Sequence, residues 1–176
     1  MKRVAFAALP VLVLAALSAF GQMPMPKPGP EVKKLDYFVG SWTMEGEMKP
    51  GPMGPGGKFT GSETDEWMPG GFFLEAHEEF KTPMGDGTAK AFMGYDTEGK
   101  MYTYHSFAST GESENSTGML EGDTWNWTSD EKMGGQTLKG KYSLTMLSPT
   151  SYSFKFEVSP DGTTWNTVME GKATKK

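Results

Sequence analysis

The feature that most constrains this chain is an alternation of apolar and polar residues that begins near residue 40 and continues to the end. In the segment 151–158, Tyr152, Phe154 and Phe156 alternate with serine, lysine and glutamate residues. Because successive side chains of a strand point to opposite faces, this period of two predicts strands with one buried face. Ten such strands are predicted, at residues 41–49, 58–67, 71–80, 88–95, 101–108, 113–120, 124–129, 137–147, 151–158 and 164–174. The sequence therefore predicts an all-β protein.

Short turns separate the predicted strands. Residues 68–71, 96–99, 121–123 and 159–162 supply the glycine, proline and aspartate residues that tight hairpin turns favour. Hairpins pair strands that follow one another in the sequence, and an open meander would leave two unpaired edges that closure removes. We therefore predict one closed, antiparallel, up-and-down β-barrel. The only helical spacing, at residues 31–39, predicts a short helix that closes one end.

The first 21 residues have the order of a secretory signal peptide: Lys2 and Arg3, an apolar run at residues 4–17, and small residues before Gln22. The apolar run is shorter than the roughly 18 to 20 residues that a membrane-spanning helix needs. We expect cleavage between Gly21 and Gln22 and a periplasmic or secreted protein without a membrane span. A proline- and methionine-rich leader at residues 22–30 then precedes a single barrel domain at residues 31–176.

The composition excludes several classes of function. The chain has no cysteine, so disulfides, thiolate nucleophiles and cysteine-bound metals are excluded. Loss of Lys2 and Arg3 with the signal peptide takes the net charge from −5 to −7 and leaves no arginine. An acidic protein lacks the basic surface that nucleic-acid binding requires. We expect no nucleic-acid partner and no haem, metal or other cofactor, while the oligomeric state is not readable from the sequence.

Aromatic residues on the predicted inward face can line a pocket for a small, largely apolar ligand. The expected wall residues are Trp67, Trp125, Trp127, Tyr142, Phe154, Phe156 and Trp165, with Tyr104 or His105 as polar contacts. The same aromatics could instead fill the interior, which would leave an envelope protein that displays its leader and loops to a partner. An enzyme is the third hypothesis, although the nucleophile motif Gly-x-Ser-x-Gly is absent.

Polar residues on two predicted strands have alternative interpretations. Glu63 and Asp65 alternate with Trp67, so they could be inward carboxylates that contact a polar group of the ligand, or solubilising residues near a strand end. Glu75, His77 and Glu79 share one face of a strand and could bind a metal or transfer protons. A solvated outer face is the preferred interpretation of these three residues, because Leu74 and Ala76 occupy the opposite face.

Methionines are frequent, 14 in the whole chain, and several fall in predicted loops: Met23, Met25, Met53, Met84 and Met133. Thioethers can bind Cu(I), and they also form adaptable apolar surfaces. No regular methionine spacing favours copper, so flexible apolar loops are the preferred interpretation.

The segment Phe38-Val39-Gly40-Ser41-Trp42 resembles the opening of calycin barrels, in which a short helix precedes Gly-x-Trp in the first strand. Over nearly the whole chain after the leader, the sequence is similar to a bacterial family catalogued as domain of unknown function 1579. The residues that carry this resemblance are 35–42, Trp67 with 70–74, 93–96, 102–104 and 159–162. The family is placed near the lipocalin, fatty-acid-binding and nitrobindin-like barrels, so the resemblance implies a calycin-like barrel without an established activity.

Two departures from those relatives limit what the resemblance implies. In lipocalins the tryptophan of Gly-x-Trp packs beneath an arginine of the last strand. In this chain either Lys172 or Lys175 substitutes for that arginine, or the contact is missing. Nitrobindin-like relatives bind haem through a histidine late in the chain, yet no histidine follows His105. Haem binding is therefore not expected.

Overall fold

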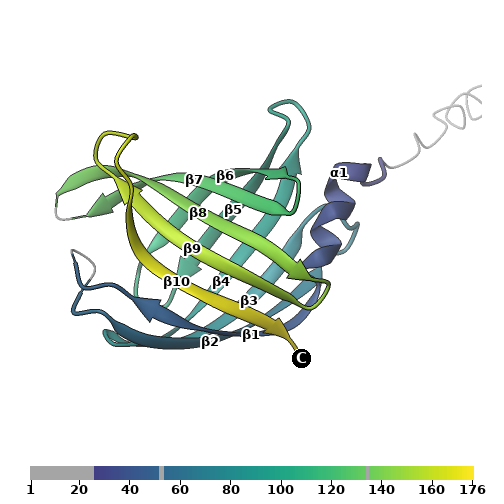
Figure 1. Ribbon diagram of the computed structural model, residues 1–176. Helices are drawn as coiled ribbons and strands as arrows, with labels where there is room; N and C mark the ends of the chain where they lie inside the picture. Colours follow the sequence, from purple (N-terminus) through teal and green to yellow (C-terminus); the bar gives the residue numbers. More distant parts are fainter. Residues whose placement is uncertain (1–25, 52–53, 134) are drawn as a thin grey trace, which may run out of the picture.

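The computed structural model of the protein describes residues 26–51, 54–133 and 135–176. Within these ranges the chain forms a closed barrel of ten antiparallel strands with a short helix at one end (Figure 1). The strands are β1 (Gly40–Met48), β2 (Gly57–Trp67), β3 (Leu74–Thr82), β4 (Gly85–Asp96), β5 (Met101–Ala108), β6 (Ser113–Glu121), β7 (Thr124–Met133), β8 (Gln136–Ser148), β9 (Ser151–Ser159) and β10 (Asn166–Lys175). The predicted fold class is confirmed. The predicted signal peptide, residues 1–21, lies outside the described residues.

Each strand pairs with its neighbours in the sequence, and the first strand pairs with the last. The closing ladder runs from Trp42 opposite Lys175 to Met48 opposite Met169. This pairing removes the two edges that an open meander would expose. The predicted strand at residues 71–80 begins only at Leu74, because the backbone N–H of Met68 donates to the carbonyl of Phe73 and closes a turn before the strand starts.

The predicted alternation matches the burial over the first half of β9 and breaks near its end, where the outward Glu157 is buried and the inward Phe156 keeps accessible surface. On β9, Tyr152 and Phe154 point inward and are buried, while Ser153 and Lys155 retain more exposure. On β2, the inward face carries Phe59 as well as several polar residues described below. No helix in the described part of the chain is long and apolar enough to cross a membrane.

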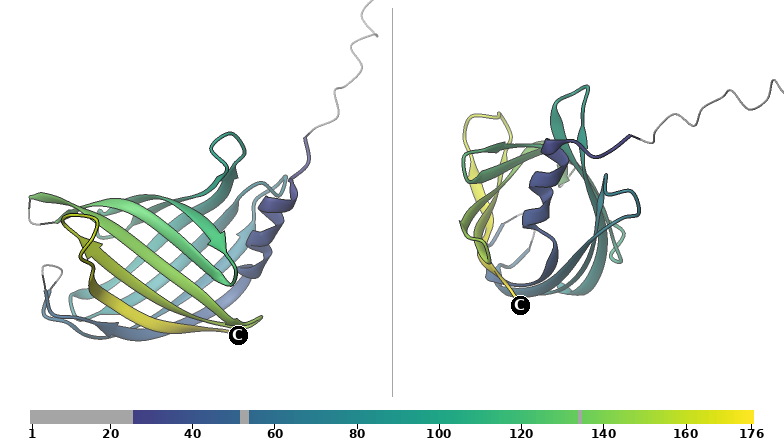
Figure 2. Two further views of the ribbon diagram at one scale, coloured as in Figure 1. Left: turned by 45° about the horizontal axis from the view of Figure 1, so that its top comes forward. Right: turned by 90° about the vertical axis from the view of Figure 1, so that its right-hand side faces the viewer.

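A short helix and a following 3-10 turn lie across one end of the barrel, as the sequence predicted (Figure 2). The elements are α1 (Pro30–Lys33) and η1 (Lys34–Tyr37). Leu35 is fully buried beneath them, and the Tyr37 hydroxyl donates to the carbonyl of Ser151 at 3.0 Å. The Tyr102 hydroxyl donates to the carbonyl of Glu31 at 3.1 Å. These contacts tie the helical segment to β9 and β5 and close this end, which we call the helix end.

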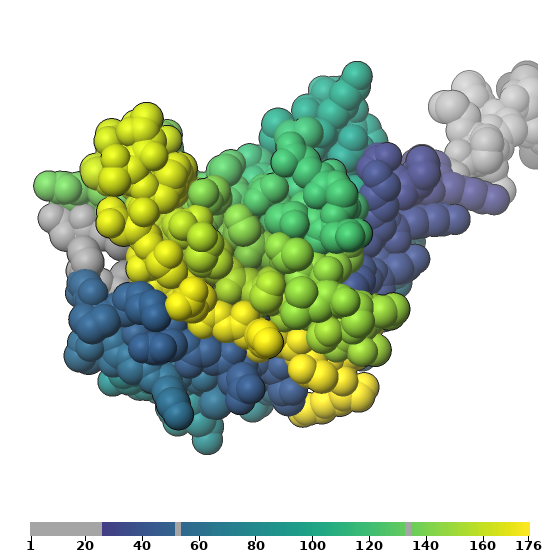
Figure 3. Space-filling view, viewed as in Figure 1, coloured from purple at the N-terminus to yellow at the C-terminus, as the bar shows by residue number. Residues whose placement is uncertain are grey.

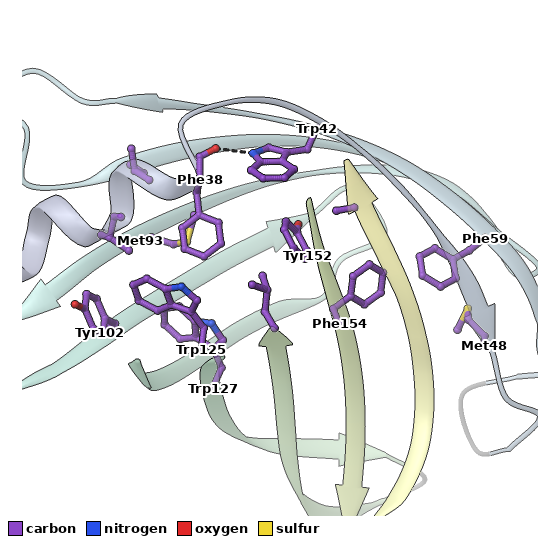
Figure 4. Close-up of a cluster of buried hydrophobic side chains, with 14 residues drawn as sticks. Phe38, Trp42, Met48, Phe59, Met93, Tyr102, Trp125, Trp127, Tyr152 and Phe154 are labelled. Carbon is purple, nitrogen blue, oxygen red and sulfur yellow. Dashed lines mark hydrogen bonds between the residues drawn. The ribbon is translucent and has the colours of Figure 1, made fainter. Parts of the chain in front are cut away.

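Trp42 is the centre of the packing at the helix end (Figure 4). Its side chain is 1% exposed, and its indole N–H donates to the carbonyl of Phe38 at 2.6 Å. The ammonium of Lys175 lies 4.9 Å from the centre of the Trp42 ring and donates to the carbonyl of Tyr37. Lys175, and not Lys172, therefore places a cation against the ring of Trp42, as an arginine does in lipocalins.

Inward glycines let aromatic rings lie along the barrel wall. Gly118 pairs with Trp127, and a Cβ placed on Gly118 would come within 2.5 Å of the Trp127 ring. Gly171 pairs with Phe154, whose ring would lie 2.6 Å from such a Cβ. A side chain at either position would push the ring away from the wall and into the barrel. The glycines therefore decide how much of the interior the aromatic side chains occupy.

Candidate functional site in the barrel interior

The interior has two regions that differ in packing and polarity. At the helix end, Trp125 and Leu74 are 0% exposed, and Phe38 packs on Trp125 with ring centres 5.2 Å apart. Farther from the helix, Tyr104 and Tyr142 also point inward, yet both keep part of their surface accessible. We call these regions the helix-end core and the lumen. Close packing in the first and accessible inward side chains in the second indicate that the barrel is not uniformly filled.

The lumen carries a cluster of inward carboxylates. Glu63 and Glu78 lie directly opposite each other on β2 and β3. Asp65 follows Glu63 on the same face, and Glu114 of β6 faces inward opposite Ser106. Like charges placed directly opposite each other in a sheet are destabilising, and burial increases their cost. We call Glu63, Asp65, Glu78 and Glu114 the acidic cluster.

Two tyrosines lie beside the acidic cluster, Tyr104 on β5 and Tyr142 on β8. The Tyr104 hydroxyl donates to Oε1 of Glu78 at 3.1 Å. Burial raises the pKa of Tyr104 well above its usual range, and the charges of Glu78 and Glu114 add to that effect. Burial likewise raises the pKa of Tyr142, with Glu63, Glu78 and Glu114 contributing. Both tyrosines stay protonated at any physiological pH, so they offer a hydroxyl and an aromatic face to the lumen.

Burial also makes the carboxyl groups of the cluster hold their protons. It raises the pKa of Asp65 to about 7, an effect that the neighbouring Glu63 carboxyl and the charge of Lys175 partly offset. Burial raises the pKa of Glu63 well above its usual range, and the charge of Asp65 acts in the same direction. Burial raises the pKa of Glu114 to about 7, with the charge of Glu131 as the next cause. Near neutral pH the cluster is therefore only partly ionised.

Asp65 is the most deeply buried member of the acidic cluster. Its side chain is 1% exposed, and neither carboxylate oxygen accepts a hydrogen bond from an N–H or O–H group among the described residues. Only a proton held by the neighbouring Glu63 could bridge the two carboxyls. A buried carboxylate without a donor costs free energy, which favours the protonated form of Asp65 and agrees with its raised pKa.

The structure distributes the predicted site residues over three places. Tyr104, Tyr142 and Phe156 reach the lumen and keep accessible surface, as the hypothesis of a wall requires. Trp125, Trp127 and Phe154 also point inward but are buried in packed layers. Trp67 keeps part of its surface accessible beside the helical segment, where its indole N–H donates to Oδ1 of Asp36 at 2.8 Å.

Two predicted site residues lie outside the barrel, so their placement corrects the sequence-based expectation. His105 is exposed and contacts the side chain of Asn115, because its neighbour Tyr104 takes the inward position. Trp165 follows β9 in a loop and stacks over the ammonium of the outward Lys141 at 4.4 Å. The prediction of Trp165 as wall extended the alternation two residues into a segment that is not strand; β10 begins at Asn166.

Two carboxylates of the lumen escaped the sequence interpretation, namely Glu78 and Glu114. The interpretation placed Glu75, His77 and Glu79 on the outer face, and the same alternation puts Glu78 inside. Glu114 has the parity of the inward Leu120 on β6. The alternation places both glutamates on the inward face, but they were missed because interior positions are expected to be apolar.

The outer face of β2 to β5 is a separate polar surface. His77 pairs with Glu75 at 3.0 Å, and Lys90 pairs with the same carboxylate at 2.9 Å. These residues are solvated, as the simpler interpretation of this face predicted. A shallow groove of about 540 Å³ crosses this face, with His77, Thr88 and Phe107 among its lining residues. Over the part of the chain that the structure describes, no group of three or more His, Cys, Asp or Glu side chains is placed to hold a metal ion.

Comparison with known proteins supports the fold and gives little on activity. Residues 27–175 match the family described as "Protein of unknown function (DUF1579)". Rv2717c from M. tuberculosis superposes with a TM-score of 0.59 at 12% identity, covering 84% of this chain and 98% of that one. The S-type phycobiliprotein lyase CPES from Guillardia theta superposes with a TM-score of 0.52 at 7% identity, covering 82% and 91%. No curated protein sequence matches the chain.

Proposed function

The chain belongs to the DUF1579 family of unknown function, and from that premise we propose that it is an exported barrel that binds a small, largely apolar molecule in its lumen. One observation carries the proposal: Tyr104 and Tyr142, midway along the barrel, point inward and keep accessible surface, whereas Trp42, Leu74 and Trp125 at the helix end are buried. Barrel mouths of this kind are recurrent sites for ligands that need apolar walls and a few polar groups.

The arrangement of the two regions supports this proposal. The helix-end core gives the barrel a rigid floor through Trp42, Phe38 and Trp125 (Figure 4). Beyond it, Tyr104 lies next to Trp127 with ring centres 6.0 Å apart, and Tyr142 stacks near Phe154 at 5.8 Å. A ligand in the lumen would meet aromatic faces on two sides and hydroxyl groups at their ends.

The end opposite the helix is the expected entrance. The turn between β3 and β4 and the loop between β9 and β10 lie there, away from α1 (Figure 1). The space-filling view shows the loop between β9 and β10 standing out from the barrel at this end (Figure 3). Met84 of the β3–β4 turn is 55% exposed, which places a flexible apolar side chain near the entrance.

Nile red, an uncharged dye whose emission shifts to the blue in apolar sites, tests the proposal. Two neighbouring substitutions separate the inside from the outside. Ala89→Phe adds a ring to the inward face of β4 opposite Glu78, and Thr88→Phe adds the same ring to the outer groove. We expect a dissociation constant at least about ten-fold higher for Ala89→Phe and no change for Thr88→Phe. A loss confined to Thr88→Phe, or no dye binding by the unmodified protein, would refute binding in the lumen.

Export rests on residues 1–21 and is tested separately. Intact-mass measurement of the protein from the periplasm or medium of an expressing bacterium should give a chain that begins at Gln22. An uncleaved chain found only in the cytoplasm would remove this part of the proposal and leave lumen binding untouched.

A further inference from the structure

The charged side chains of the barrel interior are strongly biased in sign. Among the described residues, five carboxylates point inward from the strands: Glu63, Asp65, Glu78, Glu114 and Glu131. Lys175 is the one inward cation among them, and its ammonium is committed to the Tyr37 carbonyl and the Trp42 ring at the helix end. A ligand in the lumen would therefore meet negative potential with no positive group beside it.

From this asymmetry, and resting on the proposed lumen site, we infer that the ligand is an organic cation: an apolar body that carries a protonated or quaternary amine. Such a group would lie between Glu63 and Glu78, which face each other across β2 and β3. There it would relieve the repulsion between the two carboxylates and supply the opposite charge that the strands themselves lack.

Asp65 gives an independent reason for the same assignment. It is 1% exposed, points inward from the same strand as Glu63, and has no hydrogen-bond donor among the described groups. Buried carboxylates are normally paired or hydrogen-bonded. An ammonium group bound next to Glu63 would place the missing opposite charge near Asp65, whereas an anionic ligand would add to the repulsion.

The aromatic residues around the acidic cluster suit an ammonium group as well. Tyr104 donates its hydroxyl to Glu78, and its ring lies 6.0 Å from the ring of Trp127. Tyr142 lies close enough to Glu63, Glu78 and Glu114 for their charges to act on its hydroxyl. Aromatic faces within about 6 Å attract ammonium groups, and carboxylates beside them add specificity. A bare metal ion would gain little from such rings, because hard cations prefer six or more oxygen ligands.

Decylamine, decanol and decanoate have the same alkyl chain and differ in the charge of the end group. Calorimetric titration with each compound therefore shows how the affinity depends on that charge. We expect decylamine to bind at least about ten-fold more tightly than either of the other two at neutral pH. Equal or tighter binding of decanol or decanoate would overturn the inference and leave lumen binding intact. If neither these three compounds nor Nile red binds, lumen binding itself fails and the inference fails with it.

Three glutamine variants test which carboxylates bind the ammonium group of decylamine. Glu63→Gln and Glu78→Gln should each weaken decylamine binding about ten-fold and leave decanol binding unchanged. Glu79→Gln, on the outward face next to Glu78, should change neither affinity. Equal losses for all three variants would indicate a general surface-charge effect and contradict the inference. Displacement of decylamine by millimolar calcium, with calcium itself binding tightly, would assign the site to a metal and also overturn it.

Discussion

The two regions of the barrel interior are built from the same strands but meet opposite physical demands. At the helix end, Trp42 and Trp125 pack to 1% and 0% exposure, and the inward Lys175 holds the helical segment in place. In the lumen, a few residues farther along the same strands, Glu63 and Glu78 lie side by side on neighbouring strands and point inward. Close packing stabilises a fold, whereas unpaired buried charge destabilises it. The difference indicates that close packing in the helix-end core offsets the cost of the inward carboxylates in the lumen.

The largest effect should come from breaking the helix-end core. Trp42→Ala removes the hydrogen bond to Phe38 and the ring whose centre lies 5.0 Å from the Tyr152 ring centre and 4.9 Å from the Lys175 ammonium. We expect the free energy of unfolding to fall by about 3 to 5 kcal/mol, as measured by urea denaturation. Trp165→Ala, which removes an indole outside the barrel, should cost less than about 1 kcal/mol. Similar losses for the two variants would contradict the division into core and periphery.

The second test changes the charge of the lumen through pH. The folded-state pKa values of Asp65 and Glu114 are about 7, above the values near 4 of the unfolded chain, so the folded state binds more protons between these limits. The free energy of unfolding should therefore be highest near pH 4 and decrease as the pH rises towards 7. Asp65 faces Glu63, Glu78 and, from the helix end, Lys175, so Asp65→Asn should flatten this slope.

Carboxylates outside the lumen act over a different pH range. Backbone hydrogen bonds from Thr164 and Thr163 hold the pKa of Asp161 below its usual value, so its contribution is lost only as the pH falls below about 4. Urea denaturation at several pH values between about 2 and 8 will separate the two ranges. Stability that increases as the pH rises from about 4 to 7 would show that the lumen carboxylates are not buried as described.

A smaller effect is expected when the opposed glutamates are separated. Glu63→Gln removes one of two like charges that face each other and keeps the shape of the side chain. We expect the free energy of unfolding at pH 8 to increase by up to about 1 kcal/mol, while binding of the organic cation weakens. Glu79→Gln on the outward face should alter stability by less than about 0.5 kcal/mol. Destabilisation by Glu63→Gln would mean that this carboxyl makes a contact that favours the fold.

The smallest effect should follow substitution of His105. Its side chain is exposed and contacts Asn115 outside the barrel. His105→Ala should change the free energy of unfolding by less than about 0.5 kcal/mol and leave Nile red binding unchanged. Tyr104→Phe, at the neighbouring inward position, removes the donor to Glu78 and should weaken binding. A binding defect confined to His105→Ala would reverse the assignment of the two residues to the two faces.

Most of the fold followed from local patterns. The period of two placed Tyr152 and Phe154 on the buried face, and glycine and proline residues marked the hairpins, because both signals act within a few residues. The predicted start of the last strand was wrong because it relied on the same local alternation. Its alternation continues for two residues beyond the strand, and nothing local indicates that hydrogen bonding to the neighbouring strand begins only at Asn166.

The sequence alone determined the all-β class, the closed meander, the short helix before Gly40 and the strand face that Glu63 and Asp65 share with Trp67, since each depends on backbone geometry over a few residues. Only the tertiary structure decided which inward residues become core and which line open space. That distinction depends on strands far apart in the chain: Glu78 and Glu114 approach Tyr142 from other strands, and Lys175 reaches Trp42 because the last strand closes on the first. Burial and electrostatics are properties of that closure, so the acidic lumen exists only once the barrel is complete.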